Sequence, residues 1–266
     1  TEAIRAANTQ LQNQNALLEY LNREKDEFLG VTVHGLKSPI TNMALAVAML
    51  KSKKDSMSRF DLDTNLDWIE STIWRMDDIV QKLLQSNALE SGKVSLQPVV
   101  LELPSLVSQI VENYSARADI KSINLVIEKG PGEMNAYANP AMKEDIIDNL
   151  LSNAIKFSPA HTTVRVRVYL PDEQQENQSS IDHKNIYVSI QDEGPGLSSE
   201  DKKRLFGRFE RLSAKPTGGE QSSGLGLSIV KQLTEKMNGK IWCESHQGHG
   251  ATFIVALPTT PSSSSD

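Results

Sequence analysis

Two stretches within the first 90 residues each carry an unbroken heptad pattern of apolar side chains, and this feature restricts the fold more than any other. In two successive stretches the apolar positions are spaced alternately four and three residues apart. They are Leu29, Val33, Leu36, Ile40, Met43, Val47 and Leu50, then Leu62, Leu66, Ile69, Ile73, Met76, Val80 and Leu83. Such a seam is typical of coiled coils and helix bundles. The polar run Lys51 to Asp61 between them predicts the turn of an antiparallel helical hairpin.

A hairpin of two helices would leave part of this seam uncovered. Pairing of two chains into a four-helix bundle would cover it, so we predict a homodimer. The alternative is that the hairpin docks on the second half of its own chain. Further upstream, Ile4, Leu11 and Leu18 recur every seven residues, which predicts a coiled coil over residues 1–15 that leads into the bundle.

The sequence changes character after Ser91-Gly92, a pair that signals the end of a helix. β-rich runs follow at 124–128, 163–170, 185–191, 240–244 and 251–257, with helical stretches near 103–118, 141–156 and 226–237. Because they do not alternate as regular βαβ units, we predict an α/β sandwich with helices on one face of the sheet. The predicted domains are the helical 16–91 and the α/β 92–258, followed by a disordered tail or linker at 259–266.

Composition excludes several classes of protein. The formal net charge of -6 supplies no basic face, so we expect no nucleic-acid partner. The single cysteine, Cys243, cannot form an internal disulfide, which favours a reducing compartment. No apolar run reaches the ~18 residues of a membrane span. We therefore expect a cytoplasmic segment without direct membrane contact, cut from a longer parent that could itself be membrane-anchored.

The stretch from Asn149 to Ser158 places two amides one helical turn apart. Asn149 and Asn153 would project from the same face of a helix. An amide oxygen is a hard ligand that suits Mg²⁺ beside nucleotide phosphates. The alternative is an ordinary pair of surface amides.

A second stretch, Asp192 to Leu197, follows directly after an apolar strand. Asp192 at a strand end can accept a hydrogen bond from an exocyclic amine, and Gly194 and Gly196 would let the backbone approach a flat ring. The alternative is an ordinary Asp/Gly turn.

The third stretch, Gly224-Leu225-Gly226, leads into a helix whose free N–H groups could bind phosphate. By itself this pattern is weak evidence. Before it lie the apolar run Leu205 to Arg211 and the small, polar run Ser213 to Ser223, which together predict a mobile lid with an apolar anchor. His246 and His249 lie three residues apart in a turn, but no third metal ligand accompanies them.

In this order, the stretches resemble the N, G1, F and G2 boxes of the ATP-binding domain of histidine kinases. The segment Phe28 to Pro39, with His34 inside it, resembles the phospho-acceptor box of the same family. The resemblance covers about residues 16 to 258. It implies a sensor histidine kinase core, in which a dimeric four-helix bundle precedes an α/β ATP-binding domain. Such an enzyme moves the γ-phosphate of ATP to His34 and then to an aspartate in the receiver domain of a response regulator.

The resemblance also implies roles for residues at matching positions. In the N box, Asn153 would coordinate Mg²⁺ with Asn149 nearby, and Lys156 would contact the phosphates. In the G1 box, Asp192 would bind the adenine amine, while Gly194 and Gly196 would shape its pocket.

The remaining boxes have corresponding roles. Arg211 would approach the γ-phosphate. The backbone of Gly224, Leu225 and Gly226 would bind phosphate. In the first domain, His34 would be the phospho-acceptor, with Lys37 and Ser38 beside it in the catalytic site.

One residue departs from the family pattern. The family has Glu or Asp directly after the histidine, where this chain has Gly35. In the family that carboxylate hydrogen-bonds the second imidazole nitrogen, so we predict slow autophosphorylation. Ser38 stands where family phosphatases carry Thr or Asn, which predicts weak phosphatase activity.

Two other functions stay open. One is a non-catalytic signalling scaffold that binds nucleotide, and the other is a net phosphatase that uses ATP only as a conformational ligand. Gly35 is the feature that favours the scaffold, whereas the complete set of ATP-binding motifs disfavours it. If the chain is a kinase, we expect the response regulator to dock beside His34, on Ser38, Thr41, Asn42 and Leu45.

Overall fold

The computed structural model describes residues 2–53, 57–90, 98–139, 143–171, 184–207, 210, 212–217 and 224–259. The chain divides into two compact units, residues 1–81 and 82–266. The division falls inside a helix, upstream of the domain boundary expected after residue 91. Each unit is described separately.

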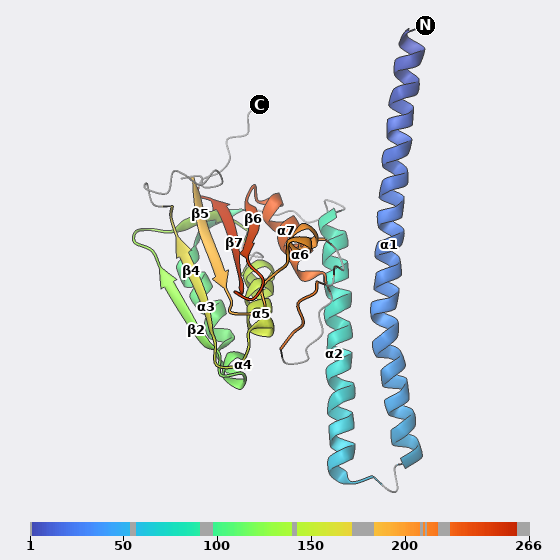
Figure 1. Ribbon diagram of the computed structural model, residues 1–266, viewed down its shortest axis with the longest axis vertical. Coiled ribbons are helices and arrows are strands. Elements are labelled where there is room, and N and C mark those ends of the chain that lie inside the picture. Colours follow the sequence, from blue (N-terminus) through green and yellow to red (C-terminus); the bar gives the residue numbers. More distant parts are fainter. Residues whose placement is uncertain are drawn as a thin grey trace. The chain divides into compact units, whose positions relative to one another are not determined.

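Two helices, α1 (Glu2–Lys53) and α2 (Arg59–Glu90), form the hairpin of the first unit (Figure 1). Few glycines and prolines interrupt this part of the sequence, and α1 continues through Pro39. The connection between Lys53 and Arg59 lies inside the predicted turn. Ser58 precedes α2, and its Oγ accepts a hydrogen bond of 3.1 Å from the backbone N–H of Asp61, as an N-cap does.

The predicted apolar seam is divided between a half-buried line and an exposed line. Met43 and Leu50 of α1, and Ile69 and Met76 of α2, are half-buried. The intervening seam residues are between 38% and 61% exposed: Val33, Ile40 and Val47 in α1, and Leu66, Ile73 and Val80 in α2. Ala46 and Thr72, which are not seam residues, are buried in this unit. The hairpin therefore covers only part of the seam within one chain.

The second unit is built on a mixed sheet of five strands in the order β2-β4-β5-β7-β6. The strands are β2 (Asn124–Lys129), β4 (Thr163–Tyr169), β5 (Asn185–Gln191), β6 (Lys240–Ser245) and β7 (Ala251–Pro258). Only the β2–β4 pair is parallel. A separate antiparallel pair joins β1 (Val99–Glu102) to β3 (Asn135–Ala138).

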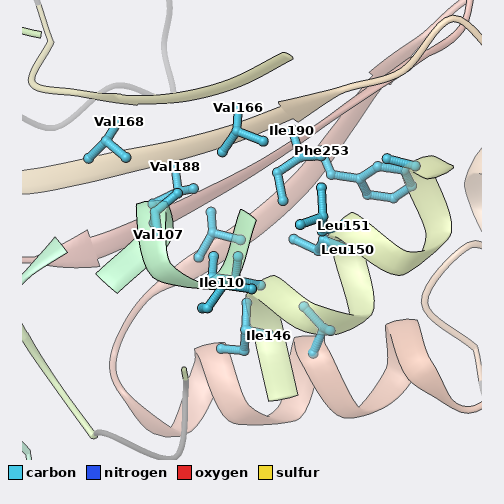
Figure 2. Packing of buried hydrophobic residues seen from close by; sticks show 14 of the residues in the cluster. Val107, Ile110, Ile146, Leu150, Leu151, Val166, Val168, Val188, Ile190 and Phe253 are labelled. Carbon is cyan, nitrogen blue, oxygen red and sulfur yellow. The ribbon is translucent and has the colours of Figure 1, made fainter. Parts of the chain in front are cut away.

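Helices lie against one face of the five-stranded sheet. They are α3 (Leu103–Asn113), α4 (Ser115–Ile120), the π-helical turn η1 (Lys143–Ile147), α5 (Asp148–Phe157), α6 (Ser199–Arg204) and α7 (Gly226–Lys236). Figure 2 shows Val166, Val188 and Ile190 of the sheet facing Ile110, Ile146 and Leu151 of the helices. Alternate strand residues point into this core, as expected for a half-covered sheet. The predicted α/β sandwich with helices on one face is confirmed.

Some predicted elements differ from the observed ones. The helix expected near 103–118 is interrupted at Tyr114, and the one expected near 141–156 begins as the π-helical turn η1. The strands β1 and β3 and the helix α6 were not predicted. Each contains only four to six residues, too few for a clear hydrophobic period. The predicted loop at 171–184 and the tail at 259–266 lie almost entirely outside the described residues.

Candidate nucleotide site

The helix α5 carries the amides and the lysine of the first motif. Asn149 donates a short hydrogen bond from Nδ2 to the carbonyl oxygen of Asp145, which orients its amide. Asn153, one turn later, makes no hydrogen bond within the described residues and is partly exposed. The side chain of Lys156 is only 7% exposed, and its ammonium lies 5.7 Å from the centroid of the Phe157 ring.

Asp192 follows directly after β5 and is 6% exposed. Its Oδ1 accepts hydrogen bonds from the N–H groups of Gly194 (2.8 Å) and Ala251 (3.2 Å). Burial raises the pKa of Asp192 to about 6, although both N–H groups act in the opposite direction. No hydrogen bond within the described residues reaches Oδ2. One oxygen is therefore fixed by the backbone and the other is available to a ligand.

Glycines allow the three motifs to approach one another closely. A Cβ on Gly226 would lie 2.7 Å from Oδ1 of Asn149, and one on Gly194 would lie 2.9 Å from the carbonyl oxygen of Phe157. Any side chain at either position would collide with α5. The structure thus brings the first and third motifs together at one end of α5 and the second motif to its other end.

The start of α7 carries the glycines of the third motif. Leu225 occupies the N-cap position and is buried, and no side chain of the described residues caps the helix. Gly224 before it has φ +71°, a conformation that favours glycine. Uncapped N–H groups at a helix N-terminus form a favourable site for phosphate.

The turn between β6 and β7 supports the loop that follows Asp192, a role that sequence reasoning missed. Ser245 accepts a hydrogen bond of 2.9 Å at Oγ from the N–H of Leu197 and donates one of 2.6 Å to the carbonyl oxygen of Gly250. Gly250 has φ +73°, and a Cβ there would lie 2.0 Å from the carbonyl oxygen of Asp192. The glycines of Gly248-His249-Gly250 were the signal that could have revealed this role.

The same turn gives no support to a metal site. His246 and His249 are both exposed. In the part of the chain that the structure describes, no group of three His, Cys, Asp or Glu side chains could hold a metal ion.

The described part of the predicted lid is anchored at several points. Leu205 belongs to the core, and Phe206 packs against it. Arg204 forms an ion pair with Glu210. Ser213 donates from both its N–H and its hydroxyl to Asp201, which also closes a capping box with Ser198 at the start of α6. These hydrogen bonds, those of Ser213 first, lower the pKa of Asp201 to about 2.

Several predicted site residues either lie outside the described residues or belong to the first unit. Arg211 and residues 218–223 lie outside the described residues. The backbone of His34 belongs to α1, but its side chain is not among those described. Lys37 and Ser38 nearby are exposed. A Cβ on Gly35 would meet no atom within 4 Å, so α1 has room for an acidic side chain there.

None of the described helices is both long and apolar enough to cross a membrane.

Two families of known domains match the chain. Residues 24–92 match the His Kinase A (phospho-acceptor) domain, and residues 140–261 match the histidine kinase-, DNA gyrase B-, and HSP90-like ATPase. The fold and site thus define a phospho-acceptor helical domain followed by an ATPase domain. The chain is therefore a sensor histidine kinase core.

Curated relatives that match the chain include a sensory kinase and a sensor protein, and both are longer than this chain. The sensory kinase SasA of Synechococcus sp. is 28% identical over 235 residues, which are 88% of this chain and 59% of SasA. The sensor protein GacS of Pseudomonas syringae is 30% identical over 269 residues, which are 97% of this chain and 28% of GacS. The chain therefore spans less than two thirds of the length of these relatives.

Solved structures share the fold at low sequence identity. The histidine kinase AdeS of Acinetobacter baumannii has a TM-score of 0.65 at 18% identity, with 85% of this chain and 98% of that chain covered. The histidine kinase ThkA in complex with the response regulator TrrA has a TM-score of 0.66 at 22% identity, with 87% and 60% covered.

Proposed function

We propose that this chain transfers the γ-phosphoryl group of Mg·ATP to His34 and then to an aspartate in the receiver domain of a response regulator. The observation that carries the proposal is the convergence on α5. Asn149 meets Gly226, Phe157 meets Gly194, and Asp192 is buried with one oxygen held by backbone N–H groups. Packing of a hydrophobic core does not require this arrangement, whereas a nucleotide-binding site does.

The residues around α5 suit the parts of Mg·ATP. Asp192 would accept a hydrogen bond at Oδ2 from the adenine amine, with Gly194 and Gly196 beside the ring. Asn153, whose amide has no partner within the described residues, would bind Mg²⁺ with Asn149 nearby. Lys156 would balance the charge of the phosphates.

Further groups would complete phosphate binding. The helix start at Gly224, Leu225 and Gly226, which no side chain of the described residues caps, would bind phosphate through backbone N–H groups. Arg211 would reach the γ-phosphate. The domains would comprise residues 1–15, 16–91 and 92–258, with a tail at 259–266.

The chemistry follows from the groups on the chain. An imidazole nitrogen of His34 attacks the γ-phosphorus, a P–N bond forms, and the bond to the oxygen that bridges the β- and γ-phosphates breaks to release ADP. Mg²⁺, when bound, would neutralise part of the phosphate charge. Asn149 cannot accept a proton from water, which favours transfer to histidine over hydrolysis.

The exposed line of the hairpin seam supports a homodimer. Val33, Ile40 and Val47 of α1 face solvent within one chain, as do Ile73 and Val80 of α2. A second copy of the same hairpin would cover these residues in a four-helix bundle.

A partner surface lies close to His34 in sequence. Ser38, Thr41 and Asn42 are exposed, and Leu45 is 62% exposed. Leu45 and Asn42 also line a groove with Trp68 of α2. We propose that the receiver domain docks here, with Leu45 as an apolar contact.

Labelling with γ-³²P ATP tests the proposed activity. The chain should acquire acid-labile, base-stable label, and His34→Gln should acquire none. Label that persists in His34→Gln would contradict the acceptor assignment. If neither protein is labelled although both bind nucleotide, the nucleotide-binding scaffold or the net phosphatase becomes the better function. Gly35 is the feature that favours the scaffold.

Restoring an acid after the histidine should increase the rate of labelling. The space around Gly35 accommodates a side chain, and Glu in place of Gly also favours the helix by about 0.5–1 kcal/mol. A carboxylate that hydrogen-bonds the imidazole should raise the autophosphorylation rate of Gly35→Glu about 10²-fold or more. Gly35→Gln is the matched control for helix stabilisation. Equal rates in Gly35→Glu and Gly35→Gln would show that the carboxylate has no such role.

A further inference from the structure

The C-terminal end of α5 is held by a lysine that belongs to none of the predicted motifs. Nζ of Lys121 donates hydrogen bonds to the carbonyl oxygens of Ile155 (2.8 Å) and Lys156 (3.1 Å) and to Oγ1 of Thr217 (2.7 Å). The last carbonyls of a helix lack partners within the helix, and a cation there also interacts favourably with the helix dipole. Lys121 therefore caps α5 from the end of α4.

Thr217 completes the same cluster. Its N–H donates to the carbonyl oxygen of Lys156 (3.2 Å), and its hydroxyl lies 2.6 Å from the carbonyl oxygen of Ser158. Oγ1 also lies 3.1 Å from the carbonyl oxygen of Lys156. Because a hydroxyl has one proton, the shorter contact identifies Ser158 as its acceptor, while Lys121 donates to the same oxygen. The cluster thus joins three segments that lie far apart in the sequence.

The segment Leu212–Thr217 is thereby fixed at two points. Ser213 is bound to Asp201 at the start of α6, and Thr217 is bound to the end of α5. Both attachments use side chains as well as backbone groups. This segment is part of the stretch between the second and third nucleotide motifs.

The end of α5 also carries Lys156 and lies against the loop that follows Asp192. Lys156 extends its buried side chain from this turn. The carbonyl oxygen of the next residue, Phe157, lies against the backbone of Gly194. A shift of this turn would therefore move both Lys156, which is proposed to balance the phosphate charge, and the loop of Gly194, which is proposed to lie beside the adenine.

We propose that Lys121 and Thr217 are positioning residues for the nucleotide. They hold the end of α5 against the segment Leu212–Thr217, so that Lys156 and Gly194 keep their places. Neither residue touches the nucleotide. This inference rests on the proposed ATP-binding function and adds two residues to it.

Calorimetric titration with Mg·ATP tests the inference with four variants. Thr217→Val removes the hydroxyl at constant shape, and Lys121→Met removes the ammonium. Each should raise the dissociation constant about tenfold, the effect of losing one interaction of typical strength. Thr217→Ser keeps the hydroxyl and should bind within about threefold of the original chain. Thr259→Val is the matched control, because its hydroxyl donates to the carbonyl oxygen of Lys184 at the opposite end of β5 from Asp192.

Coupling and kinetics separate positioning from general destabilisation. Since the two side chains act in one cluster, Lys121→Met with Thr217→Val should weaken binding no more than about threefold beyond either single variant. In the labelling assay, KM for ATP should rise about tenfold while kcat at saturation changes less than about threefold. Wild-type affinity in Thr217→Val, or failure of Thr217→Ser to restore it, would overturn the inference.

Hydrogen exchange of the nucleotide-free chain separates this inference from the proposed function. Amides of residues 212–217 should exchange about tenfold faster in Thr217→Val than in Thr217→Ser. Unchanged exchange would overturn the anchoring itself, whatever the chain binds. If the original chain binds no Mg·ATP while Thr217→Val still exchanges faster, the proposed function fails and the anchoring stands.

Discussion

In the folded chain, the Asp192 carboxyl loses its proton less readily than an ordinary aspartic acid. It is buried beside the core, and two backbone N–H groups bind one oxygen only. Its pKa of about 6 exceeds the ordinary value of 3.8, so the folded chain binds a proton more tightly than the unfolded chain. The contribution of this group to stability is therefore complete below pH ~4 and is lost as the pH rises through 6. Under the proposed function, recognition of the adenine amine accounts for a carboxyl in this buried position.

Asp192→Asn should therefore stabilise the nucleotide-free chain while abolishing its affinity for adenine. At pH 8 the free energy of unfolding should rise by about 1–3 kcal/mol, because no charge is buried, whereas at pH 4 the change should be below about 1 kcal/mol. The amide would present Nδ2, a donor, to the amine of adenine. Urea unfolding at both pH values and titration with Mg·ATP measure these effects. The same increase at both pH values would contradict the role of the buried charge.

Gly226→Ala should reduce nucleotide affinity with little loss of stability. The new Cβ would displace Oδ1 of Asn149, 2.7 Å away, and this atom ends a flexible side chain that can shift at little cost. We expect about a tenfold weaker affinity for Mg·ATP and a free energy of unfolding within about 1 kcal/mol of the original. Gly196→Ala provides the contrast. Its φ of +68° and a backbone oxygen 2.1 Å from the new Cβ predict a loss of about 2–4 kcal/mol, measurable by thermal unfolding.

The helix α5 is the element on which the site depends, and other elements hold both of its ends. At its start, Oη of Tyr114 donates a hydrogen bond of 2.6 Å to Oδ1 of Asp148. Burial and this bond raise the pKa of Tyr114 well above its usual range. At its end, Lys121 and Thr217 bind its last carbonyls. A helix of ten residues is too short to be stable alone, so these contacts determine where its side chains lie.

Tyr114→Phe should destabilise the ATP-binding unit by about 1–2 kcal/mol. The change leaves Asp148 partly buried without this donor, at almost constant volume. Urea unfolding should show a lower midpoint with an unchanged slope. Tyr137→Phe is the control, because the Tyr137 hydroxyl makes no hydrogen bond within the described residues. Equal stability of the two variants would show that the Tyr114–Asp148 bond contributes nothing.

At the scale of the whole molecule, the divided seam favours a dimer. A hairpin that buried its full seam within one chain would leave no apolar line on its surface. Here the line through Ile40, Leu66 and Ile73 stays exposed in a single chain, whereas Ala46 and Thr72 are buried. Pairing of two hairpins would remove that apolar line from water, at roughly 25 cal/mol per Å².

A charge on the exposed line should dissociate the dimer. Ile73, 53% exposed in one chain, would be covered by the second chain, so Ile73→Asp should give a monomer that keeps its helical content. Sedimentation velocity and circular dichroism measure the two properties. Ser71→Asp, two residues away and off the seam, should remain dimeric. A monomeric original chain, or a dimeric Ile73→Asp, would refute the predicted bundle.

Local sequence patterns determined most of the elements. The β-rich run from Asn185 to Gln191 predicts a strand with the bounds that the structure has, because β-branched and aromatic side chains favour the strand conformation. The heptad positions predict both long helices, because residues three and four apart lie on one face of a helix. The motifs at Asn149, Asp192 and Gly226 could be recognised because their residues lie close together in the chain.

Tertiary structure alone decided which residues support those motifs. Lys121, Thr217 and Ser245 act through hydrogen bonds to backbone groups 34 to 59 residues away, at Ile155, Ser158 and Leu197. Such bonds recognise carbonyl and amide groups that every residue carries, so the sequence does not identify which residues they join. Likewise, the heptad pattern shows that a seam exists but not which half of it one chain buries. That depends on how the two helices pack, since residues of equal hydrophobicity compete for the same interface.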